Sequence, residues 1–404
     1  MAGGRIRIGL VWRIVIAMAL GVVCGFVLPD AGLRVLKTFD SMVSVLLKFV
    51  VPLVITGLVT AAIVESGRSA GRMLAVTFAL VLVSVIGSGF FAYGLSTAAV
   101  PKIMGGSFAS GLGAVGSGLK PYFTLQVPPV FNIMTALALA VVVGLAIVRT
   151  NAEGLGRLAV EMKDAVAWIL AKVLVPVLPW YILAMTADMT AGGKIVSLFA
   201  VFACVIAFST AVTLAYLLVM FTIAGAYTAR NPLKLLWTMK DAYVTAFATC
   251  SSAASIPVSL AGVKKCGVSE ETAEFVVPMC ATIHLSGSMI KLVCCAASLM
   301  FIGGGELDAG RFATFIMVMT ATAIAAPGIP GGVITSSLGA LASIMMFTPE
   351  QCSMMMTVYL AMDGVGSACS VAGHAPIALV TDKLLGRRGQ GDRDGDRQTG
   401  GQTV

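Results

Sequence analysis

TCSSAASIPVS, residues 249–259, interrupts an apolar stretch and leaves an arm on each side too short to cross a bilayer. AAPGIPGG, residues 325–332, does the same further along the chain. Small polar residues, glycine and proline at membrane depth are tolerated only where protein or a water-filled cavity covers the exposed backbone. Each stretch therefore predicts the tip of a re-entrant helical hairpin.

Each predicted hairpin precedes a longer apolar span that is itself broken. TIHLSGS breaks the span at 270–302, and MDGVGSACSVAGH breaks the span at 350–386. The order hairpin, broken span thus occurs twice, which is typical of an inverted repeat with a binding site where the breaks meet. The alternative is a set of ordinary helix kinks in a membrane bundle.

Composition places the chain in lipid. Of its 404 residues 58% are hydrophobic and only 11% are charged, whereas soluble domains carry about 25% charged residues. The apolar runs are continuous rather than alternating, which favours helices over a barrel. We therefore predict an all-α polytopic membrane protein. The net charge of +8 lies scattered in short loops, which fits membrane orientation and not binding to nucleic acid.

The first half of the chain reads as uninterrupted spans. Arginine and lysine residues at the N-terminus and after every second span predict cytoplasmic N- and C-termini in a cell inner membrane. The nine cysteines follow no metal or disulfide spacing, and the tail after residue 386 is polar and glycine-rich. The expected spans lie near 8–29, 40–66, 72–100, 129–148, 158–190 and 195–226.

Several motifs together resemble one transporter family. Four motifs, which appear in the right order along the chain, are similar to segments of the dicarboxylate/amino acid:cation symporters, the glutamate-transporter family: LLKFVVPLV, TAFATCSSAASIPV, GVSEETAEFVVPMCATIHLSGS and PGIPGG. The resemblance implies eight transmembrane helices and two re-entrant hairpins, a homotrimer, and a transport domain that moves like an elevator. It divides the chain into scaffold helices at 1–71, a third span and loop at 72–128, scaffold and trimerisation helices at 129–193, a transport domain at 194–386 and a cytoplasmic tail at 387–404.

The resemblance also implies a substrate site at the breaks. Hairpin tips offer backbone N–H groups to a substrate carboxylate, although small residues there are equally explained by close helix packing. Asp363, an isolated carboxylate in a broken span, aligns with the aspartate that binds the substrate amine; the alternative is a structural ion pair with a lysine. The implied substrate-binding residues are Ser251, Ser252, Ser288, Gly328, Ile329, Pro330, Gly331, Asp363, Ser367, Ser370 and Lys291.

Two departures from the family pattern concern charge. Where acidic-substrate members carry an arginine, this chain has Gly366 or Cys250, which favours a neutral substrate. Lys291 lies inside a span, where a lysine is costly and usually paired. It could supply the missing positive charge, occupy a vacated cation site, or neutralise Asp363.

The third departure concerns the coupling cation. His284, Ser286, Ser370 and His374 stand where sodium-coupled members have asparagines and aspartates. Sodium prefers oxygen ligands, whereas histidine is the side chain most easily switched near neutral pH. Two interpretations remain open: proton coupling through His284, Ser286 and His374, or a pair of neutral core histidines. A metal site is disfavoured, because no third ligand stands at a suitable spacing.

The sequence therefore predicts a symporter of an amino acid or a dicarboxylate, driven by sodium or protons, with no cofactor beyond the co-transported ion. Alternatives are a proton-coupled or uncoupled exchanger of small neutral amino acids, or a transport-inactive relative. An intramembrane enzyme is not expected, because the chain has no His-Glu-x-x-His motif, no Gly-x-Ser-x-Gly elbow and no pair of aspartates in broken spans that could form an aspartyl dyad.

Overall fold

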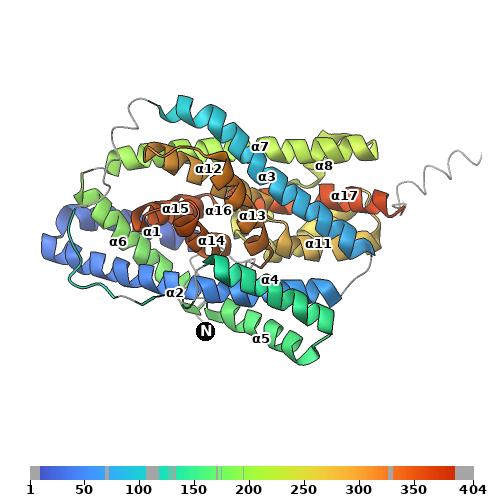
Figure 1. Ribbon diagram of the computed structural model, residues 1–404. Helices are drawn as coiled ribbons and strands as arrows, with labels where there is room; N and C mark the ends of the chain where they lie inside the picture. The colour runs from blue at the N-terminus through green and yellow to red at the C-terminus, as the bar shows by residue number, and fades with distance from the viewer. Residues whose placement is uncertain are drawn as a thin grey trace, which may run out of the picture.

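The computed structural model describes residues 10–68, 72–105, 118–125, 127–128, 130, 133–169, 172–173, 175–193, 195–325 and 331–386. Every regular element in this part of the chain is a helix (Figure 1). The predicted all-α class is therefore confirmed. Four of these helices are long and apolar enough to cross a membrane: Met73–Met104, Ala200–Thr228, Glu270–Ile302 and Asp363–Leu384.

The first half of the chain forms long helices close to the predicted spans. α2 begins earlier than expected, because Asp30 supplies an acidic first turn, which favours a helix start. The helices are α1 (Leu10–Val27), α2 (Asp30–Arg68), α3 (Arg72–Met104), α4 (Ile133–Thr150), α5 (Glu153–Ile169), α6 (Val175–Ala191) and α7 (Ile195–Thr228).

The expected span at 158–190 corresponds to α5, which ends at Ile169, and α6, which begins at Val175. Residues 170, 171 and 174, between these two helices, lie outside the described residues. α5 contacts α2, whereas α6 contacts both α1 and α2.

The second half consists of two similar series of helices, and we call the first two α-helices of the first series the first hairpin and those of the second series the second hairpin. In each series, these two helices contact each other and a longer span follows with a break inside it. After α8 (Pro232–Thr238), the first series is α9 (Lys240–Thr249) and α10 (Ile256–Lys265), then α11 (Glu270–Ile283) and α12 (Ser286–Ile302). The second series is α13 (Ala309–Ala325) and α14 (Gly332–Ser343), then α15 (Pro349–Ala361), α16 (Asp363–Ala372) and α17 (His374–Leu384).

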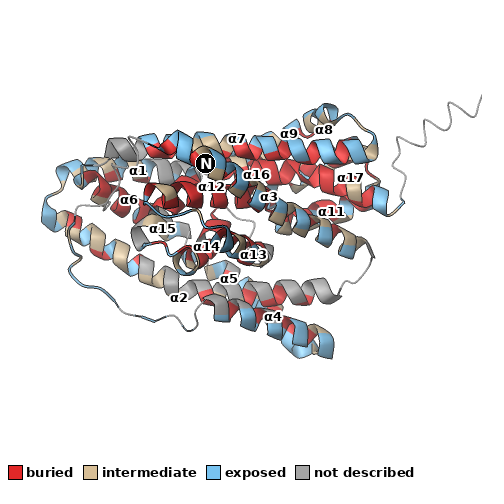
Figure 2. Cartoon of the chain, turned by 45° about the horizontal axis from the view of Figure 1, so that its top comes forward, coloured by how far each residue is buried: buried red, intermediate tan, exposed pale blue. Residues whose placement is uncertain are grey.

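The broken spans form the centre of the molecule. α12 contacts α3, α7, α15 and α16, and α16 contacts α9 of the first hairpin. Figure 2 shows α12, α16 and α17 almost entirely in the colour of buried residues. α2 lies along the outside of the second hairpin, where it contacts both α13 and α14.

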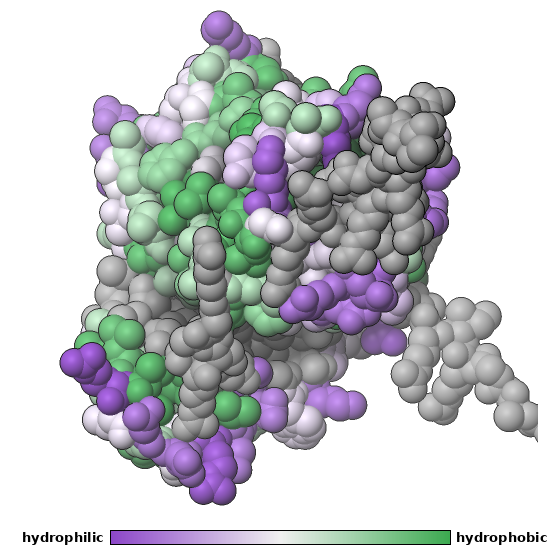
Figure 3. All heavy atoms as spheres, turned by 90° about the vertical axis from the view of Figure 1, so that its right-hand side faces the viewer, coloured by the Kyte–Doolittle hydropathy of each residue, from purple (hydrophilic) through white to green (hydrophobic). Residues whose placement is uncertain are grey.

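The outer surface carries large apolar side chains. Phe26, Val83, Val142 and Ile223 are all more exposed than buried, and Figure 3 shows apolar residues spread over much of one face, with hydrophilic residues gathered towards its edges. Such a surface suits contact with lipid.

All nine cysteines of the chain are free thiols. Six of them are buried, and Cys24, Cys204 and Cys352 are partly exposed.

Candidate functional site

Asp363 joins three separate elements at the centre of the second half. It is the first residue of α16, directly after the break at Met362. Its Oδ1 accepts a hydrogen bond from Lys291 Nζ of α12 at 2.9 Å, and its Oδ2 accepts one from the backbone N–H of Gly331 at 2.9 Å, next to the tip of the second hairpin. Asp363 thus connects both broken spans to that hairpin.

The Lys291–Asp363 ion pair is almost completely enclosed. The side chain of Lys291 is 0% exposed and that of Asp363 is 7% exposed. Lys291 Nζ also lies 3.9 Å from the centroid of the Tyr359 ring, over its face. A buried charge is tolerated when it is paired and hydrogen-bonded, and a cation over an aromatic face gains further attraction.

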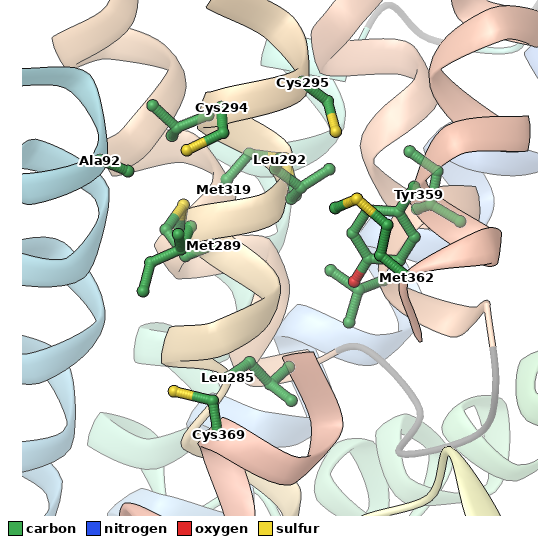
Figure 4. Packing of buried hydrophobic residues seen from close by; sticks show 14 of the residues in the cluster. Ala92, Leu285, Met289, Leu292, Cys294, Cys295, Met319, Tyr359, Met362 and Cys369 are labelled. Carbon is green, nitrogen blue, oxygen red and sulfur yellow. The ribbon is translucent and has the colours of Figure 1, made fainter. Parts of the chain in front are cut away.

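Two glycines make room for this pair. A Cβ at Gly366 would overlap the Cδ, Cε and Nζ atoms of Lys291, and a Cβ at Gly287 would overlap the backbone of Gly366. α12 and α16 can therefore approach closely only because both positions lack a side chain. Figure 4 shows Cys295 of α12 on the side of Tyr359, whereas Met289 and Cys294 point towards Ala92 of α3.

The tip of the first hairpin is a tight turn in front of α16. Cys250 ends α9 in the left-handed conformation, with φ of 51°. Ser251 Oγ accepts a hydrogen bond from the N–H of Ala254 at 3.3 Å, and Ser252 is buried. Behind the turn, a Cβ at Gly364 would lie 2.6 Å from the carbonyl oxygen of Phe247, so the end of α9 is packed directly on the first turn of α16.

The two histidines of the chain lie together at the breaks of the two spans. His284 ends α11 and His374 begins α17. Both are fully buried, and their ring centroids are 6.2 Å apart in an edge-to-face arrangement. A Cβ at Gly373 would lie 2.6 Å from His284 Cε1, so this glycine is needed for the two breaks to meet.

Hydrogen bonds fix the tautomer of His284. Its Nδ1 lies 3.1 Å from the carbonyl oxygen of Ser370 and must donate there. Its Nε2 is then the acceptor for the hydroxyl of Ser84 in α3, at 3.0 Å. A carbonyl cannot donate, so the neutral ring with a proton on Nδ1 satisfies both contacts.

His374 is less completely satisfied. Its Nδ1 lies 3.0 Å from Ser259 Oγ in α10, and its Nε2 has no hydrogen-bond partner among the described residues. Ser286 Oγ, at the start of α12, is also buried and has no hydrogen-bond partner among the described residues. Unsatisfied buried polar atoms are rare and point to an unfilled role.

Ser370 links α16 to the start of α12. Ser370 Oγ accepts a hydrogen bond from the N–H of Gly287 at 3.2 Å, so Ser370 contacts the first turn of α12 as well as His284. Ser288 and Ser367 are both buried. No group of three or more histidine, cysteine, aspartate or glutamate side chains suited to a metal ion occurs among the described residues.

The structure thus places the predicted residues in two neighbouring groups. Lys291, Asp363 and Gly331 form one, and His284, Ser370 and His374 form the other. Of the three roles considered for Lys291, its contact with Asp363 fits neutralisation of that carboxylate. The predicted residues Gly328, Ile329 and Pro330 lie outside the described residues.

Sequence reasoning missed the partners supplied by other helices. Ser84 and Ser259 bond the two histidines, and Tyr359 lies under Lys291. Ser84 is one of several hydroxyl side chains in the apolar α3, so its type alone did not single it out. Nothing in the local sequence pairs it with a histidine 200 positions away.

A family model confirms the resemblance that the motifs suggested. The model of the sodium:dicarboxylate symporter family matches residues 10–384. The chain belongs to this family. It is a family of transporters and not of enzymes, and its members reside in membranes, in agreement with the apolar helices described above.

Curated relatives of the chain carry the names of amino acid transporters. Neutral amino acid transporter A of Homo sapiens is 28% identical over 218 residues, which cover 51% of this chain and 40% of that protein. Neutral amino acid transporter B(0) of Mus musculus is 33% identical over 124 residues, 30% of this chain and 22% of that protein. Serine/threonine transporter SstT of Streptococcus thermophilus is 26% identical over 341 residues, 81% of this chain and 83% of that protein. The matches thus span less than half of the two mammalian relatives.

Proposed function

We propose that this chain is a secondary active symporter that moves an amino acid or a dicarboxylate across the inner membrane, driven by a sodium or proton gradient. The observation that carries the proposal is the double hydrogen bond of Asp363, which ties the breaks of two membrane helices to a hairpin. Ionisable residues inside membrane spans mark substrate and ion pathways. Helix interruptions that meet near the middle of the membrane are typical of transporter binding sites.

The proposed substrate site lies between the two hairpin ends and α16. Ser251 and Ser252 stand at one end, and Gly331 stands beside the other. Backbone N–H groups and hydroxyls at such turns suit a carboxylate. We include Ser288 and Ser367 in the site, because both are buried on the helices that carry Lys291 and Asp363.

We further propose an elevator movement of a transport domain against a scaffold. In this division, residues 1–71 and 129–193 form the scaffold, which assembles as a homotrimer, and residues 194–386 carry the substrate. The long α2 supports this division, since it contacts α4, α5 and α6 and also runs along α13 and α14. Both termini are placed in the cytoplasm on the basis of the loop charges.

The coupling ion is a separate part of the proposal. Sodium coupling is supported by the family description. Proton coupling is favoured by one specific observation, the two buried histidines at the breaks, one of which retains a ring nitrogen without a partner among the described residues. Histidine is the side chain whose charge changes most easily near neutral pH.

Uptake into proteoliposomes tests the proposal. The purified full-length protein is reconstituted, and labelled alanine, serine, aspartate and succinate are offered with a sodium gradient, a pH gradient or neither. We expect concentrative uptake of at least one solute that depends on one gradient. Uptake no greater than in protein-free liposomes under all three conditions would contradict the proposal.

A second experiment separates the alternatives. An uncoupled exchanger of small neutral amino acids would show counterflow of labelled solute without any ion gradient, whereas a transport-inactive relative would show none. A symporter differs from both because it accumulates solute above the external concentration when a gradient is imposed.

A further inference from the structure

The charge at the centre of the site is already balanced within the chain. Asp363 and Asp382 are the only buried carboxylates among the described residues, and Asp382 bonds Ser269 at the start of α11. Asp363 is therefore the one acidic side chain of the described part that stands at the site. Its two oxygens bind Lys291 Nζ and the N–H of Gly331.

The lysine is held in place by more than its charge. Its stem fills the space left by the missing side chain of Gly366, and its ammonium group lies over the ring of Tyr359. Because the side chain is fully buried, it cannot turn towards water without moving α12 or α16. In the described part of the chain it has no second acidic partner.

A solute with an ammonium group would have to compete with this lysine. If the ammonium group displaced Lys291 from Asp363, the lysine would become a buried charge without a counterion, which is strongly unfavourable. If Lys291 stayed, the ammonium group would lose its hydration without gaining a carboxylate partner, and it would lie near a like charge. Both outcomes penalise a substrate amine.

A solute carboxylate meets the opposite situation. The turn of the first hairpin provides the hydroxyl groups of Ser251 and Ser252, and the Lys291–Asp363 pair is neutral as a whole, so Asp363 does not repel an anion. We propose that this site selects carboxylates that lack an amino group, with Lys291 taking the place at Asp363 that a substrate ammonium group would otherwise take. This inference rests on the proposed transport function and specifies the substrate class of the same site.

Matched pairs of solutes test the selection. Full-length protein in proteoliposomes is offered labelled succinate and aspartate, lactate and alanine, or glycerate and serine, at equal low concentrations under sodium and pH gradients. In the pairs the amine-free member is expected to enter at least about tenfold faster. Equal uptake within each pair, or faster uptake of the amino acids, overturns the selection but leaves the transport function intact. Uptake of none of the six solutes overturns the transport function itself and the selection with it.

Two variants and one control show whether Lys291 is responsible. Lys291→Met exposes Asp363 to the solute and should shift the uptake ratio towards the amino acids by about tenfold or more. Lys291→Met leaves a buried carboxylate unpaired. The double variant Lys291→Met/Asp363→Asn therefore removes both charges and keeps the site neutral, and it should bring the uptake ratio close to one. Lys265→Met changes an exposed lysine of the first hairpin and should keep the wild-type ratio. A wild-type ratio in the folded double variant, verified by its thermal unfolding, overturns the role of the lysine.

Discussion

The imidazole rings of His284 and His374 meet edge to face, with their centroids 6.2 Å apart, where the two broken spans come together. If a proton travels with the substrate, this pair is its proposed binding place. Wild-type uptake should then rise several-fold as the external pH falls from about 8 to about 6, because an imidazole that meets water during the transport cycle gains a proton in that range. His284→Asn and His374→Asn should each flatten the pH profile of uptake.

The control for that experiment is Ser84→Ala. It removes the hydroxyl that bonds His284 Nε2 but leaves both rings in place, so a pH dependence of uptake should persist. If both asparagine variants keep the wild-type pH profile while transporting at a measurable rate, the histidines are neutral packing residues and proton coupling through them is wrong.

Gly366 should not tolerate even a methyl group. A Cβ at this position would overlap Lys291, and forcing extra atoms into a close-packed core costs roughly 1–3 kcal/mol. We expect Gly366→Ala to lower the thermal unfolding temperature in detergent. Gly94→Ala is the matched control: Gly94 lies in α3 with no atom within 4 Å of a Cβ, and replacing a helical glycine there should be neutral or stabilising. Equal melting temperatures for both variants would show that α12 and α16 do not pack as described.

The ion pair between Lys37 and Asp188 connects α2 to α6. The Nζ–Oδ2 distance is 2.8 Å and both side chains are partly buried, with 20% and 14% exposed. Hydrogen bonds between charged groups contribute roughly 1.5–3 kcal/mol, and partial exposure places this pair at the lower end. Lys37→Ala, Asp188→Ala and the double variant form a cycle in which unfolding in detergent should show a favourable coupling energy. A coupling energy of zero would mean that the two charges act independently.

Asp382 anchors the start of α11 to α17. Its carboxylate accepts hydrogen bonds from the hydroxyl and the N–H of Ser269, and it is buried. Asp382→Ala removes the acceptor of both hydrogen bonds and should lower stability by roughly 1–3 kcal/mol. Asp382→Asn retains one acceptor oxygen and should lower stability less. If thermal unfolding ranks the two variants in the reverse order, the hydrogen bonds to Ser269 are not what anchors the helix.

The sequence predicted the interruptions better than the contacts across them. The break at TIHLSGS and the end of α9 at Cys250 were visible because polar residues, glycine and tight turns are conspicuous inside apolar runs. Pairing is harder still. Lys291 and Asp363 are 72 positions apart, so composition showed that each needed a partner but could not establish that they share one bond.

The buried thiols have a practical consequence for measuring movement. Six of the nine native cysteines are enclosed, so replacement of Cys24, Cys204 and Cys352 should leave a background that reacts little with water-soluble alkylating reagents. Cysteines introduced in pairs along the contact between α2 and α14 could then be cross-linked to trap single positions of one layer against the other. The order in which such cross-links form or disappear when solute is added would test the proposed elevator movement directly.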